Sequence, residues 1–133
     1  MTLFNLIIST PEDVFFEGAV KSLKAKTSFG QFQMYGNHEP YIATVRPCIF
    51  TMVDSNNNVL EYVISEGTIE TKGESVVLCV NSIESKDSID AQKAQDSKVR
   101  AEERLASKDY KIEKKRAKNA LDRAKARIEL SSK

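Results

Sequence analysis

Hydrophobic and polar residues alternate along the first part of the chain at the period of a β-strand. Phe4, Leu6 and Ile8 occupy every second position before Thr10-Pro11 breaks the run. Turn residues separate further runs of this kind, which predict strands over 14–18, 19–26, 30–35, 41–45, 48–53, 59–64, 67–71 and 75–80. Eight or nine short strands leave no room for crossover helices, so antiparallel pairing is expected. The pattern predicts a β-sandwich or a flattened barrel over residues 1–83.

Residues 84–133 change to a helical period. One apolar stripe consists of Ala117, Ala120, Leu121, Ala124 and Ile128, and a thinner one of Ile89, Ala94, Ala101 and Leu105. Asp87 or Ser88 is expected to cap the first helix, and Asp109 the second. Because alanine removes little apolar area from water, this helical hairpin should pack weakly and be able to move between partners. The predicted fold class is α+β, with an antiparallel sandwich followed by a two-helix hairpin.

The distribution of charge supports the same division. Residues 1–83 contain 5 basic and 9 acidic side chains, whereas residues 84–133 contain 15 basic and 10 acidic ones. The whole chain is almost neutral, at +1, only because a net −4 and a net +5 cancel. A basic helical tail on an acidic body is expected to meet an acidic partner surface, its own body or a nucleotide. The alternative is a charged helix that is simply solvated.

Several classes of site find no support in the sequence. Cys48 and Cys79 lie 31 positions apart without a metal-binding spacing, so both are expected to be free thiols in the core. His38 has no nucleophilic partner placed by the sequence, and no glycine-rich phosphate loop is present. We therefore expect neither a metal site nor a catalytic site. The chain also lacks a long apolar run and an export signal, which predicts a protein that is cytosolic or docked to something cytosolic.

Short motifs follow one another along the chain in a characteristic order. They are Ile8-Ser9-Thr10-Pro11-Glu12, Val14-Phe15-Phe16-Glu17-Gly18, Gly30 with His38 and Pro40, Ser65 with Gly67, Ile89-Asp90, and Ala120-Leu121 with Ala124 and Ile128. In this order, over the whole chain, they resemble the epsilon subunit of F-type ATP synthases, called delta in mitochondria. Tyr35-Gly36-Asn37 stands where the family has Leu-Pro-Gly, and Glu66 replaces a family glycine. The chain therefore resembles a divergent member of bacterial type.

The resemblance implies a non-catalytic rotor subunit, present in one copy per complex, that couples proton transport to ATP synthesis or hydrolysis. The sandwich would bind the gamma subunit and the c-ring, and the hairpin would inhibit ATP hydrolysis at the alpha/beta hexamer. Such a protein would lie at the cytoplasmic face of a bacterial cell membrane, in contact with the membrane only through the complex. An epsilon-like subunit of a rotary ATPase with another output is an alternative.

The resemblance also implies three sets of site residues. Contact with gamma and the c-ring is expected at Gly30, Tyr35, Gly36, Asn37, His38 and Pro40. Contact with a beta subunit is expected at Lys111, Lys114, Lys115 and Arg116. No cofactor is expected except a regulatory ATP, which some bacterial epsilon subunits bind at positions matching Glu84, Ile89, Asp90, Lys93, Arg100, Arg123 and Arg127.

The nucleotide set has an alternative interpretation. Lys93 stands where the motif has Arg, so the positive charge is kept but the planar, bidentate fork is lost. Arg123 and Arg127 are four positions apart, so they lie on one face of a helix. On the alternative interpretation they only make that face hydrophilic and bind no nucleotide.

The basic cluster at 111–118 also raises the question of nucleic acid. Glu113 and Asp122 interrupt the positive charge, and Tyr110 is the only aromatic residue of the tail that could stack on a base. We therefore expect no nucleic-acid binding, and we keep a basic-tailed nucleic-acid or scaffold adaptor as the alternative from a different class.

Overall fold

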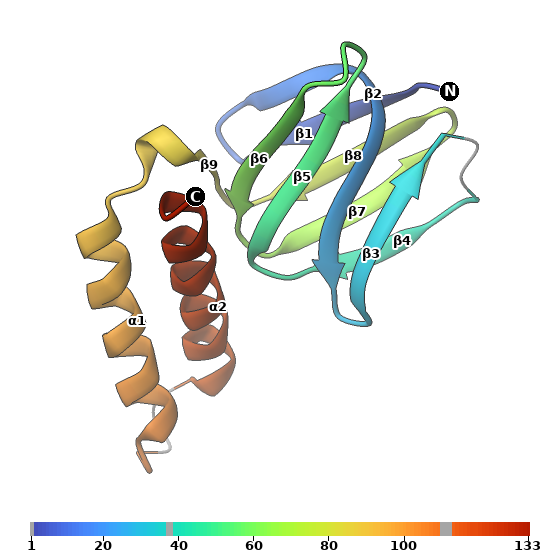
Figure 1. The fold of residues 1–133 in the computed structure, drawn as a ribbon. Coiled ribbons are helices and arrows are strands. Elements are labelled where there is room, and N and C mark those ends of the chain that lie inside the picture. Colours follow the sequence, from blue (N-terminus) through green and yellow to red (C-terminus); the bar gives the residue numbers. More distant parts are fainter. Residues whose placement is uncertain (1, 37–38, 110–112) are drawn as a thin grey trace.

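The computed structural model describes residues 2–36, 39–109 and 113–133, and it shows a sandwich of strands with a pair of helices beside it (Figure 1). The strands are β1 (Phe4–Ser9), β2 (Val14–Thr27), β3 (Gly30–Tyr35), β4 (Ile42–Val45), β5 (Cys48–Asp54), β6 (Val59–Ile64), β7 (Gly67–Lys72), β8 (Ser75–Val80) and β9 (Ile83–Ser85). A 3-10 turn, η1 (Lys86–Ser88), leads to the helices α1 (Ala91–Ala106) and α2 (Lys114–Ser131). The predicted α+β architecture is confirmed.

The long strand β2 joins the two layers of the sandwich. Its first half pairs with β1, and its second half pairs with β3 and β5. One layer contains β1, β8, β7 and β4, and the other contains β3, β2, β5, β6 and β9 (Figure 1). The two segments expected at 14–18 and 19–26 are thus one strand. Pairing is antiparallel except between β1 and β8, which are parallel, so the expectation of wholly antiparallel pairing is wrong at this one place.

Alternate residues of the strands fill the space between the layers. Leu6 and Ile8 of β1, Phe50 and Met52 of β5, and Ile69 of β7 are completely buried there. This is the period of two that the sequence shows, because successive side chains of a strand point to opposite faces. Cys48 also lies in this core as predicted, but Cys79 is exposed, so its expected burial is wrong. Cys79 belongs to the alternate set of β8 that faces outward.

Both helices begin later than predicted. The side chain of Asp90 caps α1 by accepting a hydrogen bond from the backbone N–H of Lys93 at 3.1 Å, because residues 86–88 form the 3-10 turn instead. Helix α2 starts at Lys114 without a side-chain cap, so Asp109 does not serve as one. None of the described helices is long and apolar enough to cross a membrane.

Helix α2 lies between α1 and the sandwich (Figure 1). The predicted stripe packs on α1, with Ala117 and Ala124 buried beside Ala94 and Ala101 of that helix. A second, short stripe of α2, Ala126 and Leu130, packs on the outer face of the sandwich. It packs with Val63 and Ile49 of the sandwich and with Ile89, which lies between η1 and α1. The apolar contact between hairpin and sandwich is therefore small.

Gly67 offers a test of how closely the strands β7 and β8 approach. A Cβ atom at this position would lie 1.9 Å from the carbonyl oxygen of Cys79 and 2.8 Å from the Cα of Val80, so the backbones would have to separate. We expect Gly67→Ala to lower the free energy of unfolding by about 1–3 kcal/mol, the usual cost of forcing extra atoms into a packed site. Denaturant unfolding measures this change, with Thr68→Ala at the exposed neighbour as the control. Equal stability of the two variants would contradict the close approach.

Candidate functional site

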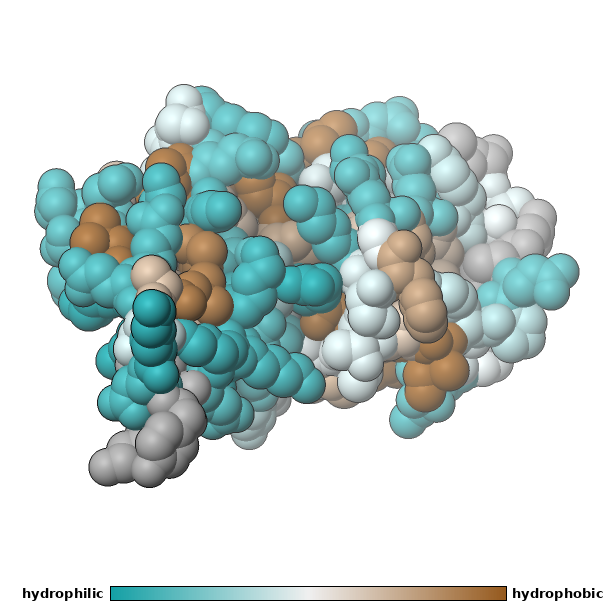
Figure 2. Space-filling view, turned by 90° about the horizontal axis from the view of Figure 1, so that it is seen from below, coloured by the Kyte–Doolittle hydropathy of each residue, from teal (hydrophilic) through white to brown (hydrophobic). Residues whose placement is uncertain are grey.

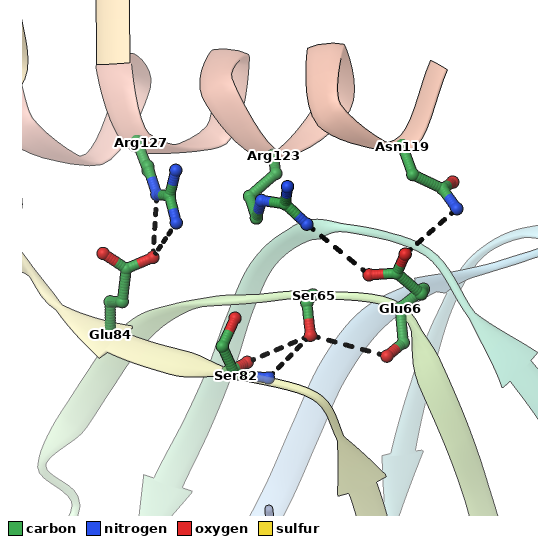
Figure 3. A network of polar contacts seen from close by, with 7 residues as sticks. All are labelled: Ser65, Glu66, Ser82, Glu84, Asn119, Arg123 and Arg127. Atoms are coloured by element: carbon green, nitrogen blue, oxygen red, sulfur yellow. Dashed lines mark hydrogen bonds and ion pairs between the residues drawn. The ribbon is translucent and has the colours of Figure 1, made fainter. Parts of the chain in front are cut away.

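Glu66, at the turn between β6 and β7, holds the middle of α2. One carboxylate oxygen accepts a hydrogen bond from the Asn119 amide at 3.1 Å, and the other lies 3.6 Å from a guanidinium nitrogen of Arg123 (Figure 3). Both partners are on the side of α2 that faces the sandwich. A single residue of the sandwich therefore makes a polar contact with each of two successive turns of the helix.

The turn that carries Glu66 is fixed by a buried serine. The hydroxyl oxygen of Ser65 accepts a hydrogen bond from the backbone N–H of Ser82 at 2.7 Å, and the two backbones are also bonded (Figure 3). Ser65 is almost completely buried, whereas the side chain of Glu66 is about one third exposed. The serine thus anchors the turn inside the sandwich, and the next residue reaches out to the helix.

Glu84 on β9 holds the C-terminal half of α2. Its carboxylate oxygen accepts from Arg127 at 2.7 Å from Nε and 2.5 Å from Nη2 (Figure 3). Both side chains are only about one quarter exposed. Near the chain end, the Lys133 ammonium lies 3.0 Å from the Glu61 carboxylate. The sandwich therefore supplies three carboxylates, on β6, β9 and the turn after β6, to cations of the hairpin.

Asp122 makes an ion pair with the sandwich of the opposite polarity, since here the helix supplies the acid. It lies 2.8 Å from Arg46 in the turn between β4 and β5, and 3.0 Å from Lys118 one helical turn earlier. Partial burial of Asp122 tends to raise its pKa, but the hydrogen bonds from Arg46 and Lys118, with their positive charges, lower the pKa below the ordinary value. Asp122 is therefore ionised at neutral pH and contributes to docking in that form.

The residues proposed for a regulatory nucleotide are brought only partly together. Arg100, Arg123 and Arg127 line a cavity of about 180 Å³ between α1 and α2. The other proposed residues do not line this cavity. Asp90 caps α1, Ile89 packs against the sandwich, Lys93 is exposed and Glu84 is paired with Arg127. The cavity is smaller than the roughly 300 Å³ at which ligand pockets begin, so the docked hairpin presents arginines without a nucleotide-sized space.

The residues proposed for gamma and the c-ring lie at two ends of the sandwich. Gly30 opens β3 and Tyr35 closes it, so about 17 Å separates them at strand spacing. Gly36 packs against Thr2, Pro40 is exposed, and Asn37 and His38 lie outside the described residues. Three large hydrophobic side chains are also exposed at or near β3 and β4: Phe29 at 91%, Ile42 at 69% and Tyr35 at 50%. Phe29 and Ile42 were not singled out in the sequence, because period alone does not show which strand face is covered.

The basic residues proposed to contact a beta subunit have different roles in this conformation. The Lys114 ammonium donates to the carbonyl oxygens of Arg104 at 2.8 Å and Leu105 at 3.1 Å, and also contacts the carbonyl of Ser107, so it caps the end of α1. Lys115 and Arg116 are exposed at the start of α2. Lys111 lies outside the described residues. Viewed from below, the surface of the hairpin is mainly hydrophilic, with separate hydrophobic patches (Figure 2).

The described part of the chain gives little support for a reactive thiol or a metal site. Burial raises the pKa of the Cys48 thiol more than its contact with the Lys26 backbone lowers it, so this thiol is protonated and unreactive at neutral pH. No group of three or more His, Cys, Asp or Glu among the described residues could hold a metal ion.

Two family models match the chain and together cover nearly all of it. The model of the beta-sandwich domain of the ATP synthase delta/epsilon chain matches residues 3–86, and the model of the long alpha-helix domain of the same chain matches residues 87–132. The change of model falls at η1, between β9 and α1. Sandwich and hairpin therefore each correspond to one domain of this chain type.

Known proteins agree with the family models. The chain is 35% identical to the ATP synthase epsilon chain of Clostridium novyi (strain NT) over 127 residues, which are 96% of either chain. It is 35% identical to the epsilon chain of Ruminococcus albus over 134 residues, covering 100% of this chain and 99% of the other. Its fold matches a chain of the Euglena gracilis mitochondrial ATP synthase with a TM-score of 0.84 and 17% identity, covering 100% of this chain and 83% of that one. The resemblance inferred from the motifs is thus confirmed, and the chain belongs to the delta/epsilon chain family of F-type ATP synthases, as a non-catalytic subunit of the central stalk.

Proposed function

We propose that this subunit couples rotation through its sandwich, which binds the gamma subunit and the c-ring, and regulates ATP hydrolysis through its hairpin. In this proposal the docked hairpin permits rotation. The released hairpin extends toward the alpha/beta hexamer and opposes hydrolysis. The complex would lie at the cytoplasmic face of a bacterial membrane.

The polar character of the hairpin interface is the observation that carries this proposal. Among the described residues of α2, Ala126 and Leu130 are the ones buried in apolar contact with the sandwich, and four ion pairs also join the hairpin to the sandwich. Partly exposed ion pairs contribute roughly 0–1 kcal/mol each. The interface is therefore strong enough to define one docked arrangement and weak enough to open without unfolding of the sandwich.

Release would make basic side chains available to another subunit. Lys115 and Arg116 are exposed even in the docked form, and Lys114 is held by carbonyl groups at the hairpin tip. An acidic surface of a beta subunit would attract this group. The proportions of docked and extended hairpin would then depend on which of the two states makes the more favourable contacts.

The exposed hydrophobic residues support a partner surface on the sandwich. Phe29 and Ile42 are among the most exposed large hydrophobic side chains of the described residues, and Tyr35 lies at the start of the proposed contact loop. Large exposed apolar side chains commonly mark surfaces that bind another protein. We assign these exposed side chains at and near β3 and β4 to the surface that contacts gamma and the c-ring.

A regulatory ATP would have to compete with carboxylates of the chain itself. Arg123 and Arg127, which the family resemblance assigns to the nucleotide, are paired with Glu66 and Glu84 in the docked hairpin. Phosphate groups would compete with these carboxylates for the guanidinium groups. We therefore propose that any regulatory effect of ATP is weak in this chain, and that Glu66 supplies part of the negative charge that holds the hairpin.

Purification of the tagged subunit at native expression tests the proposal as a whole. Recovery of alpha, beta and gamma subunits is expected, and removal of residues 84–133 should raise ATP hydrolysis by the purified complex. Unchanged hydrolysis would leave coupling through the sandwich and overturn the inhibitory role. Absence of the other subunits would overturn the proposed partners.

Charge reversal tests the contact with the hexamer. We expect Lys115→Glu combined with Arg116→Glu to raise ATP hydrolysis by the complex by about threefold or more, because an interfacial charge pair is typically worth at least about 1 kcal/mol. Lys72→Glu with Lys98→Glu changes the net charge equally at sites away from the hairpin tip and serves as the control. The same activity in both variants would contradict the assigned contact.

Acid should weaken docking through Asp122. Its pKa in the docked chain lies below the ordinary value of 3.8, so its contribution is fully present above about pH 4 and is lost as pH falls through the docked pKa. NMR of the Ile49 and Val63 methyl groups reports the docked hairpin directly. We expect Asp122→Asn to reduce docking at pH 7 by about 1 kcal/mol or less, and to remove part of the acid-dependent change. An identical titration in the variant would contradict this role.

A further inference from the structure

Strand β3 forms an open edge of the sandwich (Figure 1). Within residues 2–36, 39–109 and 113–133, this strand pairs with β2 and with no other strand. It is six residues long and contains neither proline nor a charged side chain. Natural edge strands usually carry such residues or are very short, because an unprotected edge pairs with other chains. The edge of β3 therefore lacks the usual protection against pairing.

The other end of the same layer is protected. There, β9 has only three residues, and Glu84 at its centre is charged and paired with Arg127 of α2. Shortness and a charged side chain both discourage the addition of a further strand. In the described part of this layer, β3 is thus the edge that is open to another strand.

The backbone of Lys26 in β2 faces away from β3. Its N–H donates a hydrogen bond to Cys48 Sγ at 3.4 Å, and its carbonyl oxygen accepts one from the backbone N–H of Arg46 at 2.9 Å. Both partners lie at the start of β5 or in the turn before it. Neighbouring residues of a strand alternate in the edge that their backbone groups face. The backbone groups of Ala25 and Thr27 therefore face β3.

The same alternation decides which backbone groups of β3 are free. Those two residues of β2 lie opposite Phe32 and Gly30, so these positions of β3 bond to β2. The N–H and C=O groups of Gln31 and Gln33 point to the open side instead. Among the described residues, no hydrogen bond satisfies these groups.

We propose that two copies of the free subunit pair antiparallel through this edge and form a dimer with one continuous sheet. Paired residues must both face the edge, so Gln31 lies opposite Gln33 of the second copy, and the two-fold axis passes beside Phe32. Each glutamine then bonds its N–H and C=O to those of the other. The exposed side chains of both residues are amides, which bond to each other across the strands without repulsion between like charges.

Exposed aromatic side chains at the two ends of β3 meet in this register. Phe29, in the turn before the strand, comes beside Tyr35 at the end of the second copy's strand, and the two-fold axis repeats this contact. Both side chains are at least half exposed in the single chain. Aromatic pairs across neighbouring strands stabilise a sheet. Backbone and side chains therefore favour the same register.

The size of this contact predicts a weak dimer. A fully buried aromatic side chain covers about 150–250 Å², so the rings and two short strands stay below the roughly 1,200 Å² that stable complexes bury. We therefore expect a dissociation constant of about 10 µM or weaker.

Lysine residues behind the edge do not prevent pairing. Lys24 and Lys26 lie opposite Gln33 and Gln31 on the neighbouring strand β2. Lys26 of one copy would be three strand spacings, roughly 14 Å, from Lys24 of the other. This distance exceeds the Debye length of about 8 Å at physiological ionic strength, so salt screens the repulsion.

Dimerisation concerns the unassembled subunit and goes beyond the proposed function. Phe29 and Tyr35 belong to the surface that we assign to gamma and the c-ring, so one copy could not be in the dimer and in the complex at once. The dimer would cover an edge that otherwise invites aggregation. Because the isolated chain is sufficient for the test, its outcome is separate from that of the proposed function.

Sedimentation equilibrium of the full chain, from about 10 µM to about 1 mM, tests the proposal. We expect the mass to rise from that of one chain to that of two and no further. Amide hydrogen exchange at the same concentrations locates the interface. The Gln31 and Gln33 amides should exchange severalfold more slowly at high concentration, whereas the Phe32 amide is already protected by β2. A monomer throughout, or exchange of both glutamine amides that does not change with concentration, would overturn the proposal.

Three variants change the edge or match its change in charge. Gln33→Pro removes an outward N–H and leaves the bonds to β2, so the dimer should weaken by about tenfold. Gln33→Lys places a charge on the edge, should weaken it by about threefold or more, and decides the matter if the proline variant does not fold. Gln95→Lys on the exposed side of α1 is the matched control and should change the dissociation constant less than about twofold.

The pattern of effects separates this edge from other interfaces. Equal dimerisation of the Gln33→Lys and Gln95→Lys variants would show that the edge is not used and would overturn the proposal. No ion pair crosses the proposed interface, so added salt should leave the dimer intact. Dissociation by salt would point to an interface made of ion pairs, which also overturns the proposal.

Discussion

Carboxylates on the rim of the sandwich decide where the hairpin lies. Glu66 and Glu84 pair with Arg123 and Arg127 at successive turns of α2, so the helix is aligned along the sheet edge by charge rather than by a broad apolar face. The apolar contribution comes mainly from Ala126 and Leu130. Helix α1 packs mainly on α2, so its position follows from the same few contacts. The whole helical domain therefore depends on interactions that salt and competing anions can weaken.

The periods of the sequence were sufficient to predict the two domains and most strands, because alternation and helical spacing directly reflect which side chains are buried. They did not reveal β9, whose three residues are too short to show a period. They also missed the contact made by Ala126 and Leu130, which lies beside the longer stripe facing α1. Helix starts were placed at Asp87 or Ser88 and at Asp109, because any acidic or hydroxyl residue near a boundary suits a cap. Which of them caps is settled by the turn that precedes the helix.

The candidate site shows a similar limit. The family pattern assigned Arg123 and Arg127 to a nucleotide, whereas the docked structure pairs them with Glu66 and Glu84. Glu66 was visible in the sequence as a departure from a family glycine, and its meaning depended on knowing that Arg123 lies opposite. The pairing of Asp122 with Arg46, 76 positions away, had no local signal at all. Long-range ion pairs depend on tertiary geometry. The sequence therefore identifies candidate charged residues, but not the residues with which they pair.

Lys114 links the ends of the two helices at the hairpin tip. Carbonyl groups at the end of α1 accept hydrogen bonds from a side chain that belongs to α2, so the C-terminal end of α1 is completed by the start of α2. Swinging the two helices apart would strip these carbonyls of their partner, unless α1 gained further turns whose own N–H groups replaced it. Opening of the tip and lengthening of α1 are therefore thermodynamically coupled, and the hairpin should straighten in one cooperative step rather than by gradual bending.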